Sequence, residues 1–174
     1  MKDGPLSAME LRPFIRETEG KNRCDLSLLF ADAGALRILV ERLAEPFVER
    51  GVTHVAGIDA LGFALAGAVA VRLAAGFIPI RKGSKAAWDV RSVSFRDYTG
   101  GERSLELVAD VLGPADRVLI VDDWSETGAQ LKAAAELCCS AGATVVGAAV
   151  LNADESVRAR PPAGIAVLHR VIAY

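Results

Sequence analysis

The stretch VLIVDDWSETGAQ, residues 118–130, decides the fold class of this chain. It begins with an unbroken run of apolar β-formers, Val118 to Val121, and then changes abruptly to Asp122 and Asp123. A strand that is apolar at every position is typical of a parallel sheet whose two faces are both covered. Charges at the carboxyl end of such a strand lie where open parallel sheets bind ligands. The alternative is that the two aspartates only cap the following helix.

The residues that follow, WSETGAQ, favour a ligand site. Ser125 and Thr127 supply hydroxyl donors, and Gly128 allows close approach of the chain just before a predicted helix. Backbone amides at the start of a helix bind phosphate readily. Two carboxylates suit the vicinal hydroxyls of a ribose, so the whole segment predicts a sugar-phosphate site. The segment matches neither the Walker loop nor the Rossmann fingerprint.

The remaining sequence predicts alternating strands and helices. We expect helices at 6–18, 35–50, 63–76 and 130–142, and strands at 52–58, 76–81, 117–122 and 143–151, with a last strand within 165–174. Strands and helices in this order indicate an α/β fold with a parallel sheet. The polar, glycine-bearing stretch between Arg81 and Leu105 is either a mobile lid or a connection that contains a small hairpin.

Composition and charge limit the class of protein. Residues 1–174 are 52% apolar and 24% charged, which fits one soluble domain. No apolar run reaches the roughly 18 residues of a membrane helix, and the start of the chain has no apolar targeting core, so we expect a cytoplasmic protein. The net charge of -2 gives no support for nucleic acid as a partner. The cysteines Cys24, Cys138 and Cys139 have no zinc or disulfide spacing, and we expect no metal held by the protein itself.

Residues 118–130 resemble the phosphoribosyl pyrophosphate (PRPP) motif of type I phosphoribosyltransferases. The resemblance implies a central, mostly parallel sheet flanked by helices, with a flexible lid at about 82–104. It also implies that Asp122 and Asp123 bind the ribose hydroxyls of PRPP. The segment from Ser125 through Glu126, Thr127, Gly128, Ala129 and Gln130 would enclose the 5-phosphate. Ala129 and Gln130 stand where a second small residue and a threonine are usual.

Two further blocks are similar to adenine phosphoribosyltransferase. They are VAGIDALGFALAGAVAVRLAAGFIPIRKGSK at 55–85 and DLSLLFADAGAL at 25–36. In that family the loop at Asp59, Ala60 and Leu61 contacts pyrophosphate and often contains a strained peptide bond. The basic residues at Arg81, Lys82 and Lys85 also meet pyrophosphate, partly across a dimer interface. Leu61 stands where the family has arginine, which would remove a bidentate donor to phosphate.

The same resemblance suggests two catalytic acids and a base pocket. Asp97, in SFRDYTGG, resembles a lid glutamate that is tied to catalysis, and Glu126 resembles an acid near the purine in the hypoxanthine-guanine branch. Either could instead be a solvated carboxylate, Glu126 at a helix N-terminus where the dipole favours it. A hood segment at about 20–34 would cover the base with Arg23, Cys24 and Asp25. Arg23 and Cys24 replace the phenylalanine and arginine that are usual there.

The implied activity is a pentosyl transfer of purine salvage. A purine-type base, with adenine the leading candidate, would join the ribose 5-phosphate of PRPP and release pyrophosphate. Mg²⁺ bound through PRPP or pyrophosphate, a homodimer and a cytoplasmic location are implied with it. The alternatives are a different heterocyclic base and a non-catalytic sensor of PRPP or nucleotides on the same fold.

Overall fold

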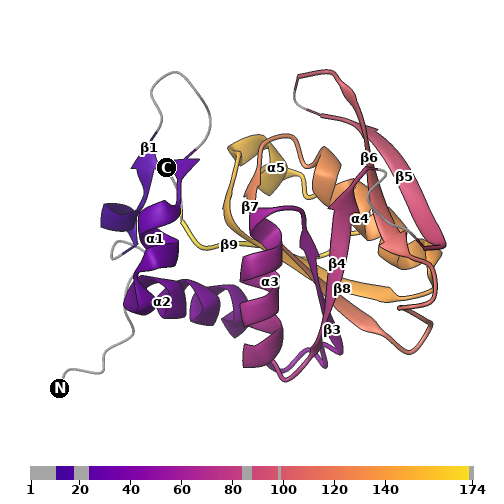
Figure 1. Ribbon diagram of the computed structural model, residues 1–174, viewed down its shortest axis with the longest axis horizontal. Coiled ribbons are helices and arrows are strands. Elements are labelled where there is room, and N and C mark those ends of the chain that lie inside the picture. The colour runs from indigo at the N-terminus through magenta and orange to yellow at the C-terminus, as the bar shows by residue number, and fades with distance from the viewer. Residues whose placement is uncertain (1–10, 18–23, 84–87, 98, 173–174) are drawn as a thin grey trace.

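The computed structural model describes residues 11–17, 24–83, 88–97 and 99–172 (Figure 1). Its helices are η2 (Arg12–Phe14), α1 (Ser27–Ala31), α2 (Ala33–Ala44), η3 (Glu45–Phe47), α3 (Leu61–Arg72), α4 (Ala129–Ser140) and α5 (Glu155–Ala159). Its strands are β1 (Arg16–Glu17), β2 (Cys24–Asp25), β3 (His54–Ile58), β4 (Gly76–Lys82), β5 (Val90–Arg96), β6 (Glu102–Val108), β7 (Arg117–Ser125), β8 (Thr144–Ala153) and β9 (Leu168–Arg170).

A mixed sheet forms the centre of the molecule. In the described part of the chain its strand order is β5-β6-β4-β3-β7-β8-β9, and β1 pairs separately with β2. The pairs β3–β4, β3–β7, β7–β8 and β8–β9 are parallel, whereas β6 is antiparallel to both β4 and β5. The predicted α/β class with a mostly parallel sheet is therefore confirmed.

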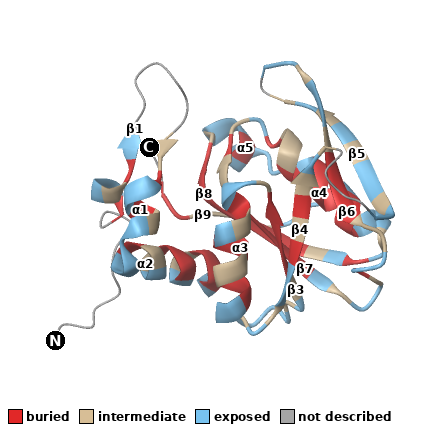
Figure 2. Ribbon diagram, viewed as in Figure 1, coloured by how far each residue is buried: buried red, intermediate tan, exposed pale blue. Residues whose placement is uncertain are grey.

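Helices cover both faces of the central strands, which explains why those strands are apolar throughout. Along β7, Leu119 and Val121 pack with α2 and α3, while Val118 and Ile120 pack with α4 on the other face. Side chains alternate between faces along a strand, so each face needs its own apolar cover. Figure 2 shows the result as buried residues along β3, β7 and β8 and on the inner sides of α2 and α3.

Two predicted helices were too long, each for a local reason. The helix expected at 6–18 is, within the described residues, only the short turn η2, because Pro13 cannot continue a helix and the chain then enters β1. The helix expected to reach residue 50 ends at Ala44, ahead of Pro46. Residues 81–105 contain the β5–β6 hairpin, as one of the two readings predicted.

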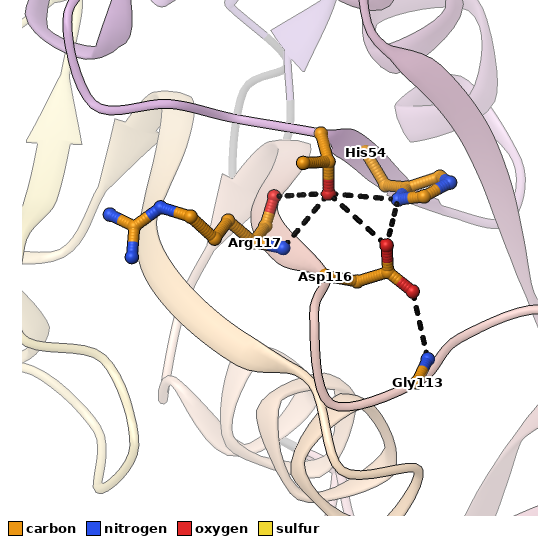
Figure 3. A network of polar contacts seen from close by, with 5 residues as sticks. His54, Gly113, Asp116 and Arg117 are labelled. Atoms are coloured by element: carbon orange, nitrogen blue, oxygen red, sulfur yellow. Dashed lines mark hydrogen bonds and ion pairs between the residues drawn. The ribbon is translucent and has the colours of Figure 1, made fainter.

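A polar network joins the amino ends of β3 and β7 (Figure 3). The Thr53 hydroxyl accepts the Arg117 backbone N–H at 2.9 Å and lies 3.0 Å from His54 Nδ1. Asp116 lies 3.3 Å from His54 Nδ1 and accepts the Gly113 N–H at 2.8 Å. These bonds fix the register of the two central strands at the end of the sheet opposite Asp122.

At the carboxyl ends, α3 approaches the sheet very closely. A Cβ added to Gly57 would lie 2.5 Å from the Gly62 carbonyl oxygen, and one added to Gly62 would lie 2.8 Å from Asp122 Oδ1. Glycine at these two positions therefore lets the first turn of α3 rest against the end of β7. Among the residues that the structure describes, no helix is both long and apolar enough to cross a membrane.

Candidate active site

A cavity of about 510 Å³ opens at the carboxyl ends of the central strands. It lies between the ends of β3 and β7, the β5–β6 hairpin and the segment around β2. Its described lining residues are Cys24, Leu26, Asp59, Ala60, Leu61, Lys82, Phe95, Asp97, Thr99, Arg103, Asp123, Trp124, Glu126 and Gln130. A smaller hollow of about 60 Å³ adjoins it along residues 124–130. The structure thus brings together predicted residues from four separate parts of the chain.

The paired aspartates have different environments. Asp123 faces the cavity, whereas Asp122 is buried beneath it with 2% of its surface exposed. The Asp122 carboxylate accepts the Asp123 N–H at 3.0 Å and the Gln130 side-chain N–H at 2.8 Å. Burial, followed by the negative charge of Asp123, raises the pKa of Asp122 well above its ordinary value. The carboxylate available to a ligand is therefore that of Asp123.

The predicted phosphate loop connects β7 directly to α4. Gly128 has a φ of 75° and a Cβ there would lie 2.7 Å from Pro162 Cγ, so both conformation and space require glycine. The Ala129 N–H donates to the Thr127 hydroxyl at 3.3 Å. Ser125, Thr127, Gly128 and Ala129 line the smaller hollow, at the N-terminus of a twelve-residue helix. The helix dipole and the backbone N–H groups of its first turn suit an anion.

The predicted pyrophosphate loop, which follows β3, lines the same cavity. The peptide bond between Asp59 and Ala60 is cis, and Leu61 begins α3 with 41% of its surface exposed. Lys82 lines the same cavity. Arg81 is not among the lining residues; its guanidinium lies over the Phe63 ring at 5.7 Å from the centroid. Lys85 lies outside the described residues.

Asp97 lines the cavity but is tightly held by its own hairpin. Its carboxylate accepts the Thr99 hydroxyl at 2.6 Å, the Thr99 N–H at 2.9 Å and the Gly101 N–H at 3.0 Å. Arg103 Nε lies 2.9 Å from the other oxygen. The Thr99 hydroxyl makes the largest contribution to lowering the pKa of Asp97, to about 2. Asp97 is consequently an ionised organiser of the turn and a weak base.

The hood segment contributes less than expected. Cys24 lines the cavity, whereas Asp25 turns back to accept the N–H and hydroxyl of Ser27 at 2.9 and 2.6 Å, and Arg23 lies outside the described residues. Sequence reasoning missed five lining residues: Leu26, Phe95, Thr99, Arg103 and Trp124. Trp124 stands inside the motif, directly after the paired acids, and its bulk there was the available signal.

Comparisons with known proteins agree with this geometry. The profile of the phosphoribosyl transferase domain matches residues 30–170. The chain is 40% identical over 151 residues to adenine phosphoribosyltransferase of Nitrosococcus oceani, covering 86% of this chain and 87% of that protein. It is also similar to the crystal structure of adenine phosphoribosyltransferase from Rhodothermus marinus, with a TM-score of 0.86, 34% identity and coverage of 94% and 96%. The enzyme from Giardia lamblia, complexed with 9-deazaadenine, gives a TM-score of 0.86 at 31% identity, with coverage of 96% and 97%.

The low pKa of Asp97 can be tested by titration. Followed by carboxyl-carbon NMR, Asp97 should titrate near pH 2, below its ordinary 3.8. Because the folded-state pKa is lowered, the contribution of Asp97 to stability should be complete above about pH 4 and lost as the pH falls from 3.8 towards 2. Thr99→Val removes the largest cause and should raise the midpoint towards 3.8, whereas Thr144→Val on β8 should not. An unchanged midpoint in Thr99→Val would contradict the assignment.

Proposed function

Because this chain belongs to the adenine phosphoribosyltransferase family, we propose that its cavity binds PRPP and a purine base, with adenine the leading candidate, and joins them with release of pyrophosphate. The observation that carries the proposal is the single cavity that unites the acid Asp123, the loop before α4, the loop before α3 and the β5–β6 hairpin. Asp123 and the loop before α4 suit a ribose phosphate, and Lys82 with the loop before α3 suits its leaving group.

The donor would be held through its ribose and its 5-phosphate. Asp123 faces the cavity as an acceptor for ribose hydroxyls, and Asp122 supports it from below. The 5-phosphate would occupy the hollow along residues 125–130, where the N-terminus of α4 supplies backbone donors. Holding both groups fixes the anomeric carbon between them, which lowers the entropic part of the barrier.

The transfer breaks the bond between the anomeric carbon and a pyrophosphate oxygen and forms a bond from that carbon to a ring nitrogen of the base. The nitrogen loses its proton, so a nearby acceptor is needed. Glu126 lines both hollows and is the acid we assign to this role. The four hydrogen bonds of Asp97 and its pKa of about 2 make it the poorer acceptor. We assign Asp97 to shaping the hairpin over the cavity.

The leaving pyrophosphate requires positive charge. Among the described lining residues the cations are Lys82 and Arg103, and Arg103 is paired with Asp97. Lys82 is therefore the described group that we assign to pyrophosphate, and Arg81 would have to leave Phe63 to join it.

Magnesium fits this site as an ion carried by its substrate. The described residues contain no cluster of three or more histidine, cysteine or acidic side chains that could hold a metal. Mg²⁺ binds readily through phosphate oxygens with few protein ligands, and when bound it would neutralise charge on the leaving group. Lys82 and the backbone of the Asp59–Leu61 loop would then orient the pyrophosphate.

The base pocket supports a second candidate, a heterocycle other than adenine. Cys24, Leu26, Phe95 and Trp124 line the same cavity as Glu126. Aromatic and apolar side chains accept any flat ring, and specificity then depends on a few polar contacts. Leucine at position 61 gives the pyrophosphate loop no guanidinium. This favours a third possibility, a protein that senses PRPP without turnover.

A homodimer and a cytoplasmic location complete the proposal. The exposed apolar side chains Val71 on α3 and Phe77 on β4 would be available to a dimer interface. Phe77 also packs edge-on against Phe63 at 5.9 Å.

Turnover with a panel of bases tests the function directly. Purified protein with PRPP, Mg²⁺ and adenine should release pyrophosphate and form the nucleotide, and other purines, pyrimidines and analogues should react more slowly. Asp123→Asn, and the double variant with Asp122→Asn, should abolish PRPP binding measured by calorimetry while circular dichroism stays unchanged. If the protein binds PRPP but turns over none of these bases, the enzyme proposal is excluded and only the PRPP-sensor hypothesis remains.

Two variants distinguish the proposed proton acceptor, Glu126, from Asp97, which organises the hairpin. Glu126→Gln should lower kcat by about 100-fold or more, because general base catalysis typically contributes that much, with little change in the KM for PRPP. Asp97→Asn should act mainly on KM. Equal losses of kcat in both variants would contradict the assignment.

Leu61 offers a gain-of-function test. Leu61→Arg should tighten pyrophosphate binding about tenfold, because a charge-assisted contact is worth more than 1 kcal/mol. Ala64→Arg, one turn along the exposed side of α3 and outside the cavity lining, is the matched control. Inhibition by pyrophosphate measures both. No difference between the two variants would refute the placement of the loop.

A further inference from the structure

Gln130 connects two parts of the site that the proposed function uses separately. It is the second residue of α4, and its side-chain Nε2 lies 2.8 Å from Asp122 Oδ2. The same side chain lines both the main cavity and the smaller hollow. One amide therefore touches the buried acid at the end of β7 while it faces the space assigned to the ribose and the 5-phosphate.

Asp122 needs this donor because of where it lies. Its carboxylate is 2% exposed, and the charged groups that face it are Asp123, which repels a second negative charge, and the more distant Lys82, which attracts it. A hydrogen bond donated to an ionised carboxylate is stronger than one between neutral groups. Burial raises the pKa of Asp122, and the bond from Gln130 opposes that effect because it stabilises the negative charge; it also fixes the direction of the Asp122 side chain.

The bond also closes the intervening chain into a ring. Asp123, Trp124 and the phosphate loop all lie between the two bonded residues, which are eight positions apart. With the ring closed, the segment can sample fewer conformations before a ligand arrives.

We propose that Gln130 is a positioning residue for the transfer: by holding Asp122 it fixes Asp123 and the phosphate loop at one separation, so that a single PRPP molecule engages both. This inference rests on the proposed function. It assigns a role to the residue at which this chain departs from the threonine usual in the motif.

Gln130→Met tests the role by removing the donor at nearly constant length. The KM for PRPP should rise about tenfold or more, the effect expected for a lost hydrogen bond to a charged group, while kcat and the KM for the base change far less. Lys132→Met, the same replacement two residues along on the exposed side of α4, should leave all three constants unchanged.

Gln130→Glu provides a readout that a purely structural residue would not give. The introduced glutamate and Asp122 would then form a carboxyl pair, which keeps a hydrogen bond while it holds one proton and is driven apart when both members are ionised. The KM for PRPP of this variant should therefore fall towards that of the wild type as the pH is lowered from about 8 to about 6. The ratio of the Gln130→Met KM for PRPP to the wild-type KM should stay constant over the same range.

Four outcomes are decisive. A PRPP KM for Gln130→Met within about twofold of the wild type overturns the inference, as does a Gln130→Glu profile parallel to the wild type. Equal rises in the KM values of both substrates also overturn it, because they indicate a general disturbance. If the wild-type protein binds no PRPP, the proposed function and this inference are both overturned. If the wild type binds PRPP and Gln130→Met has the same KM for PRPP, only the inference is overturned.

Discussion

Burial of the Asp122 carboxylate at the end of β7 is the constraint around which the site is organised. Removing a carboxylate from water costs several kcal/mol unless hydrogen bonds replace the lost hydration. Here the replacements come from the Asp123 N–H and from Gln130, and Gly62 leaves the space that the carboxylate occupies. β7, α3 and α4 must therefore meet at one point. The cavity lies where they meet.

The parallel sheet supplies the rest of the arrangement. Because β3, β4 and β7 run in the same direction, the loops after β3 and β7 and the end of β4 lie along one edge. This edge brings Leu61, Lys82 and Asp123 around one cavity although they are far apart in the sequence. The antiparallel β5–β6 hairpin then adds Phe95 and Asp97 from a third direction. An acid, Asp123, and a cation, Lys82, therefore face one cavity, as the proposed transfer requires.

Sequence alone could predict the elements whose signals are local. The apolar run of β7, the acids after it and Gly128 before α4 each follow from short-range physics, and the structure confirms the strand, the helix and the turn. The unexpected features depend on tertiary contacts. Nothing in the sequence indicated that Asp97 is held by other residues. In the folded hairpin, Thr99, Gly101 and Arg103 all donate hydrogen bonds to its carboxylate. Gln130 looked like a loss in the phosphate loop, because no local pattern shows that its amide reaches Asp122 eight residues earlier.

The network of Thr53, His54 and Asp116 lies at the amino ends of β3 and β7, whereas the cavity lies at the carboxyl ends of the same strands. The anchoring network and the proposed binding site thus occupy opposite ends of the strands, and the apolar core lies between them. Substitutions at the amino ends of the strands can change thermal stability without changing which base the protein accepts. Substitutions at the carboxyl ends can change the substrate without changing the residues that anchor the strands. Divergence at Leu61, Cys24 and Gln130 on a preserved fold is the pattern that such independence allows.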